Sequence, residues 1–201
     1  KIGDGDKPDD NLYWGCDEGV RAWFSHSDRW KKLGASKPSC ADILDRVVFK
    51  HSTRDVYLIA DAWRGQAIKA CTVAFASASA GEGSEAVGVG DLILKAGGEA
   101  DLVAYIGHNG LMDFGIDWPS KRAGREVRKP VIVLCCISGR YFGPHLRELG
   151  ADPLLTTTQL MYPGAFILHD ALEVWLAGGN PAAMTAAAGK ACAKNQHISF
   201  K

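Results

Sequence analysis

The sequence lacks any long apolar run. No stretch approaches the roughly 20 apolar residues of a membrane-spanning helix, so we expect no membrane partner. The start of the chain also lacks the basic and apolar regions of a secretory signal, and the sequence leaves the cellular compartment open. The 201 residues, 47% of them apolar, are enough for one domain with a full hydrophobic core.

Cysteine is scarce and scattered. The six cysteines include no Cys-x-x-Cys pair, the spacing typical of structural zinc sites. We therefore expect neither a metal site nor a disulfide scaffold, and we predict no cofactor. Charge of one sign is not in excess, because 23 basic residues balance 23 acidic ones. Without a basic stripe, nucleic acid is not expected as a partner.

Two short motifs are typical of ion-binding loops, and each has a simpler interpretation. Residues 1–11 carry four aspartates but lack the glutamate that closes a calcium loop, so we interpret them as a solvated entry segment. Residues 81–86 match a Gly-x-Gly-x-x-Ala phosphate loop. However, Glu82 and Glu85 place negative charge where a pyrophosphate would bind. A mobile glycine-rich loop over 81–90 is the simpler interpretation, and a phosphate-binding protein is the alternative.

Short apolar runs alternate with segments of helical periodicity. Strands are predicted at 47–49, 55–60, 101–106, 130–134 and 154–158. Helices are predicted at 20–27, 40–44, 66–80, 91–95, 141–149, 163–177 and 181–192. The first two strands should form a hairpin. The alternation predicts one α/β domain over 1–201 with a mainly parallel sheet, in which 1–44 form an aromatic-rich N-terminal extension.

Two of the apolar runs end in reactive side chains. The run at 102–106 leads to His108, and the run at 131–134 leads to Cys135 and Cys136. Both runs are short and rich in β-branched residues, which is typical of strands buried on both faces. Sites in open parallel sheets collect beyond the carboxyl ends of the strands. We therefore expect the histidine and a cysteine to meet on one rim of the sheet.

The two adjacent cysteines cannot serve the same role. Successive strand residues point to opposite faces, so Cys135 and Cys136 cannot both face His108. We favour Cys136 as the nucleophile because the Ser-Gly dipeptide that follows it permits a sharp turn off the strand, although the sequence leaves the choice open. A free thiol is mostly protonated at neutral pH, and a neighbouring imidazole can take its proton and pass it on.

The residues at 136–142 read Cys-Ile-Ser-Gly-Arg-Tyr-Phe. After an apolar strand, this resembles the Cys-x-Ser-Gly-x-x-Phe motif of the legumain-like members of the caspase-like (clan CD) cysteine peptidases. The earlier Ile-Gly-His at 106–108 is similar to that family's strand followed by His-Gly, and the order of the motifs agrees. The resemblance covers roughly 55–178. It implies a caspase-like three-layer α/β sandwich that cleaves peptide or protein substrates with a His108–Cys136 dyad.

The resemblance also implies further roles. Backbone N–H groups of Asn109 or Gly110, with that of Cys136, would form the oxyanion hole. Asp61 and Asp113 follow predicted strands on the expected rim and are candidates for substrate binding, which would favour a basic substrate residue. The chain departs from the family pattern because Asn109 stands where glycine is usual and the two motifs lie closer together. These departures indicate an alternative, a non-catalytic caspase-like binding or regulatory module. The oligomeric state is left open.

Overall fold

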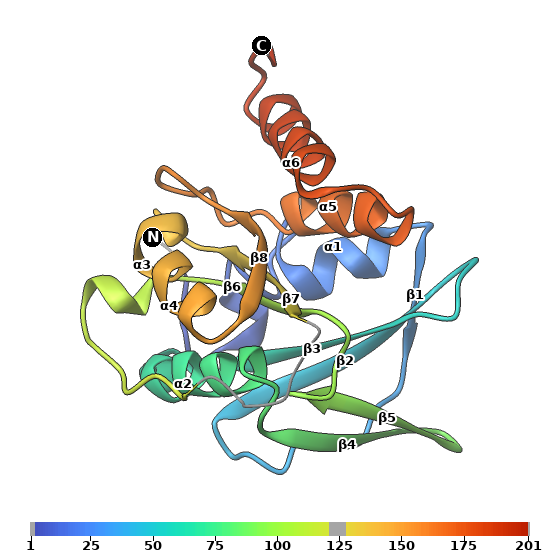
Figure 1. Cartoon of the computed structure of the whole chain (residues 1–201). Coiled ribbons are helices and arrows are strands. Elements are labelled where there is room, and N and C mark those ends of the chain that lie inside the picture. Colours follow the sequence, from blue (N-terminus) through green and yellow to red (C-terminus); the bar gives the residue numbers. More distant parts are fainter. Residues whose placement is uncertain (1–2, 121–127, 201) are drawn as a thin grey trace.

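The computed structural model describes residues 3–120 and 128–200, shown in Figure 1. They form α-helices and strands in three sheets, which confirms the mixed α/β class. The strands are β1 (Trp30–Leu33), β2 (Ile43–His51), β3 (Tyr57–Trp63), β4 (Ser84–Val89), β5 (Leu92–Gly97), β6 (Val103–Ile106), β7 (Lys129–Leu134) and β8 (Ala151–Thr156). The helices are α1 (Val20–His26), α2 (Ile68–Ser79), α3 (Ser138–Tyr141), α4 (Gly143–Glu148), α5 (Phe166–Leu176) and α6 (Pro181–Asn195), with short 3-10 helices η1 (Pro8–Asp10), η2 (Gly65–Ala67) and η3 (Gly110–Met112).

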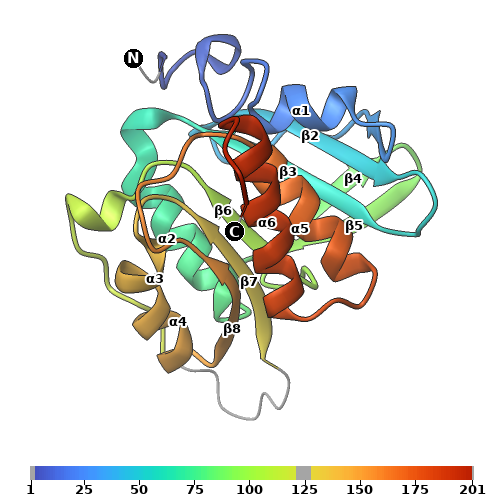
Figure 2. The same cartoon turned by 90° about the horizontal axis from the view of Figure 1, so that it is seen from above.

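Strand β7 lies at the centre of a parallel sheet, between β6 and β8. Its apolar residues alternate between two hydrophobic clusters. Ile132 and Leu134 pack with residues of α5 and α6, whereas Val131 and Val133 pack with residues of α2 and α4. Helices therefore cover both faces of this sheet, with α5 and α6 on one side and α2 on the other (Figures 1 and 2). Burial on both faces explains why the run reads as continuously apolar.

The first three strands form a separate antiparallel sheet in the order β1-β2-β3. The predicted hairpin of β2 and β3 is confirmed, but both strands are longer than expected. The predicted helix at 40–44 is wrong, because β2 already begins at Ile43, which pairs with Trp63. Parallel pairing within the described residues is confined to β6, β7 and β8, so the prediction of a mainly parallel sheet applies to that sheet alone.

Strands β4 and β5 form a hairpin where a loop at 81–90 and a helix at 91–95 were predicted, so both predictions are wrong. Val89 pairs with Leu92, which leaves a two-residue turn in which Gly90 has a φ of +58°. Glycine tolerates this conformation, and such turns match the twist of hairpin strands. The alternative of a phosphate loop is also wrong, because the segment at 81–86 follows α2 rather than a strand and its last three residues belong to β4 rather than opening a helix.

The N-terminal extension shares the main core. Phe24 of α1 is fully buried and contacts the rings of Trp30 and Phe49, and Trp14 belongs to the same cluster as residues of β7 and α5. The helices predicted at 66–80, 163–177 and 181–192 are confirmed with shifted ends, and the one predicted at 141–149 is divided into α3 and α4. In the described part of the chain, no helix is long and apolar enough to cross a membrane.

Candidate active site

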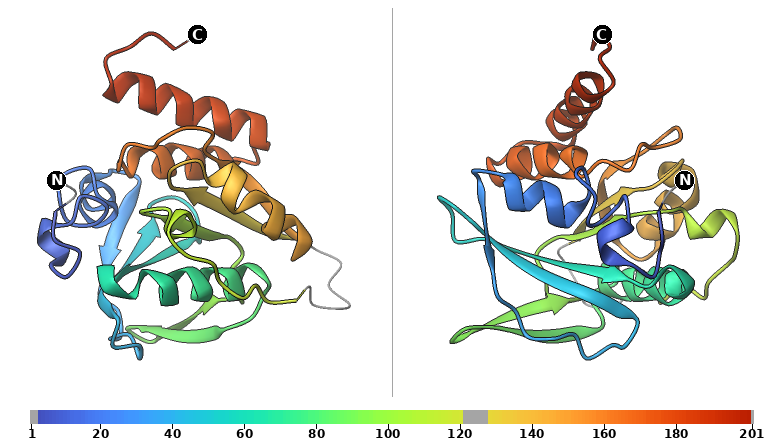
Figure 3. Two further views of the ribbon diagram at one scale, coloured as in Figure 1. Left: turned by 90° about the vertical axis from the view of Figure 1, so that its left-hand side faces the viewer. Right: turned by 180° about the vertical axis from the view of Figure 1, so that it is seen from behind.

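The carboxyl ends of β6 and β7 lie side by side. The two strands pair in parallel, with Ile106 opposite Leu134. The pairing continues for one more residue, because the Gly107 backbone N–H donates to the Leu134 carbonyl oxygen at 3.1 Å. His108 and Cys136 therefore leave the sheet on the same rim, as the sequence predicted. The left panel of Figure 3 faces this edge, where the N-terminal segment, η3 and α3 gather.

Asn109 joins the two loops that follow these strands. Its side chain is fully buried, and its amide Nδ2 donates to the Cys136 carbonyl oxygen at 2.6 Å. Its Oδ1 accepts the Leu111 backbone N–H at 3.1 Å, which caps η3. The sequence assigned Asn109 to the oxyanion hole through its backbone and did not foresee this role of its side chain.

The backbone donors predicted for the oxyanion hole are located on this rim. Among residues 3–120 and 128–200, no loop or turn hydrogen bond from the backbone N–H groups of Asn109, Gly110 and Cys136 is found. Gly110 is buried under the ring of Phe114, whose Cζ would lie only 2.4 Å from a Cβ at this position. A side chain at 110 would therefore displace the Phe114 ring, and both Asn109 and Gly110 are buried.

His108 is exposed and has a carboxylate partner. Its Nε2 lies 2.6 Å from Oδ2 of Asp113. Its backbone carbonyl oxygen accepts the hydroxyl of buried Tyr105 at 2.7 Å. Asp113, which the sequence assigned to substrate binding, is thus hydrogen-bonded to the candidate catalytic histidine.

The two cysteines differ in their surroundings. Cys135 is fully buried in the cluster beneath the sheet, and burial raises the pKa of its thiol to about 12. Cys136 is half-buried, and its Sγ accepts the backbone N–H of Met161 at 3.4 Å. An unreactive, protonated Cys135 and a more accessible Cys136 agree with the preference drawn from the sequence.

The residues after Cys136 make the sharp turn that the sequence suggested. Ile137 has left-handed backbone angles, with a φ of 53° and a ψ of 35°. Ser138 is buried and its hydroxyl donates to the Val133 carbonyl oxygen at 2.7 Å, while it accepts the Thr157 backbone N–H at 2.8 Å. The serine therefore ties the end of β7 to the segment after β8.

Tyr13, from the aromatic-rich N-terminal extension, and Met161, which the sequence did not single out, border the site. Burial, followed by the nearby Cys136 sulfur, raises the pKa of Tyr13 to about 12. The N-terminal segment is also joined to the loop that carries Met161, because the Ala165 backbone N–H donates to the Glu18 carbonyl oxygen at 2.7 Å. Residues before α1 thus contribute to the surroundings of the thiol.

Asp61 has a different setting from the one the sequence predicted. It lies within β3 rather than after it, because the strand extends to Trp63. Both carboxylate oxygens accept hydrogen bonds from the buried guanidinium of Arg46, at 2.6 and 2.7 Å. Arg46 also binds both carboxylate oxygens of Glu85, on β4. The Asp61 carboxylate is therefore held in an ion-pair network, and its assignment to substrate binding stays a prediction.

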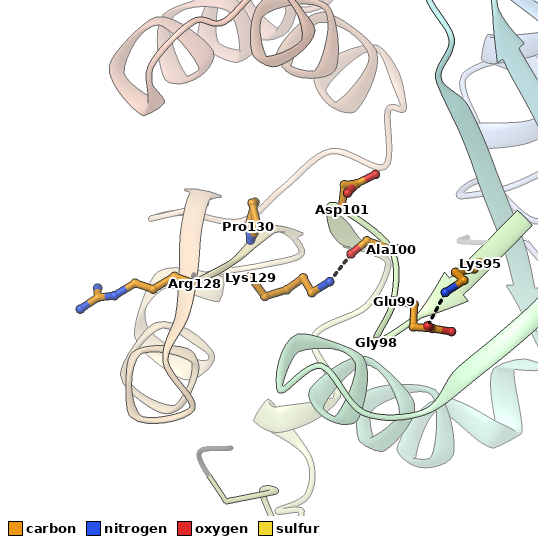
Figure 4. A pocket seen from close by; sticks show the side chains of 8 residues that line it. All are labelled: Lys95, Gly98, Glu99, Ala100, Asp101, Arg128, Lys129 and Pro130. Carbon is orange, nitrogen blue, oxygen red and sulfur yellow. Dashed lines mark hydrogen bonds and ion pairs between the residues drawn. The ribbon is translucent and has the colours of Figure 1, made fainter. Parts of the chain in front are cut away.

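A pocket lies at the opposite ends of β6 and β7 and is distinct from the rim that holds His108 and Cys136. Figure 4 shows its lining residues, which are Lys95, Gly98, Glu99, Ala100, Asp101, Arg128, Lys129 and Pro130. The Lys129 ammonium donates to the Ala100 carbonyl oxygen, and Lys95 pairs with Glu99 at 3.0 Å. In the described ranges, no group of three or more His, Cys, Asp or Glu side chains is arranged to hold a metal ion.

Comparison with known proteins assigns no family to the chain. No family model matches it, and no match is found among the curated proteins or the solved structures. Only the residues and geometry of the rim therefore bear on the function.

Proposed function

We propose that the protein is a caspase-like cysteine peptidase in which Cys136 is the nucleophile and His108 the general acid and base. One observation carries the proposal: β6 and β7 pair in parallel up to Ile106 and Leu134, and the Asn109 side chain then bonds to the Cys136 carbonyl oxygen. This arrangement delivers an imidazole and a half-buried thiol to one rim of the sheet.

The finer fold assignment, a caspase-like three-layer sandwich, belongs to the same proposal. It is supported by the helices on both faces of the β6-β7-β8 sheet and by the order of the motifs. The short, buried strands hold the rim rigidly, which suits a site that must position reacting groups. In this assignment, the β1-β2-β3 sheet and the β4-β5 hairpin are extra elements beside the three-layer sandwich.

The proposed reaction needs only groups on the rim and water. His108 removes the proton from the Cys136 thiol, and the sulfur electron pair attacks the carbonyl carbon of the peptide bond. The imidazolium then gives that proton to the leaving amine as the C–N bond breaks, which leaves a thioester on Cys136. Water, losing a proton to His108, attacks the thioester, and the C–S bond breaks with return of the proton to sulfur.

The oxygen that becomes negative in each tetrahedral intermediate needs hydrogen-bond donors. In the proposal this role belongs to the backbone N–H groups of Cys136, Asn109 and Gly110, from which no loop or turn hydrogen bond is found within the described residues. Removing one such donor costs about 3 kcal/mol in related acyl-transfer enzymes. The second donor that the sequence predicted thus has two candidates, Asn109 and Gly110.

The substrate is proposed to be a peptide or protein. The preference for a basic substrate residue loses its support, because Asp61 already binds Arg46 and Asp113 already binds His108. The exposed apolar side chains of Leu160 and Tyr162 flank Met161 in the loop that contacts Cys136. These side chains favour a substrate with apolar groups beside the scissile bond.

A library of fluorogenic peptides tests the proposal. The wild-type protein should release the fluorophore from some of its members, and Cys136→Ser and His108→Ala should release it at least a thousandfold more slowly. Circular dichroism and cooperative urea unfolding would establish that each variant is folded. A folded wild-type protein that turns over no peptide would support the non-catalytic binding module instead.

A further inference from the structure

We propose that Asp113 is a positioning residue for His108, whose carboxylate holds the imidazole in the tautomer that leaves Nδ1 to exchange a proton with Cys136. The inference rests on the proposed function, since it takes His108 to be the base. The observation behind it is the 2.6 Å separation between His108 Nε2 and Asp113 Oδ2.

The chemistry of the carboxylate fixes the tautomer. An ionised carboxylate has acceptors and no donor, so the hydrogen in this contact belongs to Nε2. In a neutral imidazole the remaining lone pair then lies on Nδ1. The thiol proton of Cys136 therefore moves to Nδ1, and from there to the leaving amine nitrogen. When the ring is protonated, the same carboxylate stabilises its positive charge.

The backbone at this position is already held in place. The Tyr105 hydroxyl binds the His108 carbonyl oxygen, and Asn109 is buried with both ends of its side chain bonded. Asp113 is held as well, because its backbone N–H donates to the Gly110 carbonyl oxygen at 2.9 Å. What remains to be fixed is the orientation of the imidazole ring, and the Asp113 carboxylate is the group that contacts it.

The expected effect is moderate because the pair is exposed. The side chains of His108 and Asp113 are 49% and 62% exposed, so water and salt screen their attraction. Loss of the carboxylate in Asp113→Ala should slow the alkylation of Cys136 by iodoacetamide about three- to tenfold. Asp113→Asn should slow it at least as much, because an amide can donate to Nε2 and favour the opposite tautomer.

The tautomer itself gives the decisive readout. In uniformly 15N-labelled protein, the side-chain nitrogens of His108 are assigned by their loss in His108→Ala. The wild-type protein should show hydrogen on Nε2 at a pH where the ring is neutral, and Asp113→Ala should show a mixture of the two tautomers. Asp117→Ala is the matched control, since it removes another exposed carboxylate of the same loop and should change neither the tautomer nor the alkylation rate.

Two results would overturn the inference: hydrogen on Nδ1 in the neutral wild-type ring, or a tautomer that Asp113→Ala leaves unchanged. Failure of the proposed function looks different. In that case the protein cleaves no peptide and His108→Ala alkylates at the wild-type rate, while the NMR measurement still decides whether Asp113 orients the ring.

Discussion

The antiparallel β1-β2-β3 sheet and the parallel β6-β7-β8 sheet use carboxylates in different ways. In the antiparallel sheet, Asp61 lies within a strand and both its oxygens bind Arg46 across the ladder. Beside the parallel sheet, Asp113 lies beyond the strand end and contacts the exposed His108. Parallel strands end on one side, so polar groups that follow them converge, whereas charges inside antiparallel strands pair with cross-strand neighbours. A carboxylate beyond the end of a parallel strand is therefore a candidate for chemistry, whereas a carboxylate within an antiparallel strand forms a structural ion pair.

The largest effect should come from the two adjacent cysteines at the end of β7. Cys136→Ala should lower kcat/KM on the best library peptide by more than about a thousandfold, because it removes the nucleophile. Cys135→Ala should leave kcat/KM within about threefold and lower the free energy of unfolding by about 1 kcal/mol through lost burial. The reverse pattern would show that the nucleophile is assigned to the wrong cysteine.

Loss of the ion pairs that Arg46 forms with Asp61 and Glu85 should lower the stability of the fold without changing the reactivity of Cys136 on the rim. Arg46→Ala leaves two carboxylates without their partner and should lower the free energy of unfolding by about 2–4 kcal/mol in urea titrations. Arg46→Lys keeps the positive charge but cannot bind a carboxylate in the bidentate geometry of arginine. Its free energy of unfolding should therefore lie between those of Arg46→Ala and the wild-type protein. In the folded variants, iodoacetamide should alkylate Cys136 at the wild-type rate. A slower rate would mean that the ion-pair network also affects the geometry of the rim.

The link between the two strand ends should have a smaller effect on stability. Asn109→Ala removes a buried hydrogen bond to the Cys136 carbonyl oxygen and should cost about 1–3 kcal/mol of unfolding free energy. Asn109→Asp keeps an acceptor for the Leu111 N–H but loses the amide donor, so it separates the link from the cap of η3. If Asn109→Ala and the wild-type protein have the same urea midpoint of unfolding, the Asn109 side chain does not hold the two loops together.

The smallest effect should appear at acidic pH. Hydrogen bonds from Arg46 lower the pKa of Glu85 below its ordinary value of 4.5. A carboxylate with a depressed folded pKa adds stability at pH values above 4.5, and this contribution is lost as the pH falls below that value. Urea titrations at pH 6 and pH 3.5 should therefore show that acid lowers the free energy of unfolding more in the wild-type protein than in Glu85→Gln. Equal losses would show that Glu85 does not contribute.

The sequence predicted the parallel sheet and its rim because those strands are short, β-branched and buried on both faces. It also placed His108 and Cys136 at the ends of neighbouring strands. It failed for the β4-β5 hairpin, where the glycines were interpreted as a loop, although the alternating apolar residues around Gly90 and Asp91 fit a two-residue turn. Tertiary pairing overrode the local helix signal at 40–44.

Other parts of the site could not be predicted because they depend on contacts distant in sequence. Met161 contacts Cys136 from a segment that carries no motif, and Tyr13 comes from the aromatic-rich N-terminal extension, outside the resemblance. The ion pair of Asp61 was not predicted, because its partner, Arg46, is recognised only from the register of β2 and β3. Asp113 was placed on the correct rim, but its contact with His108 depends on the turn that η3 makes.

The most direct test of the account is the rate at which iodoacetamide alkylates Cys136 at neutral pH, measured by mass spectrometry in the wild-type protein and in His108→Ala. We expect rapid labelling of Cys136 in the wild-type protein, no labelling of Cys135, and at least a tenfold slower reaction at Cys136 in His108→Ala. Equal rates at Cys136 in the two folded proteins would contradict the claim that β6 and β7 deliver an imidazole and a thiol to one site.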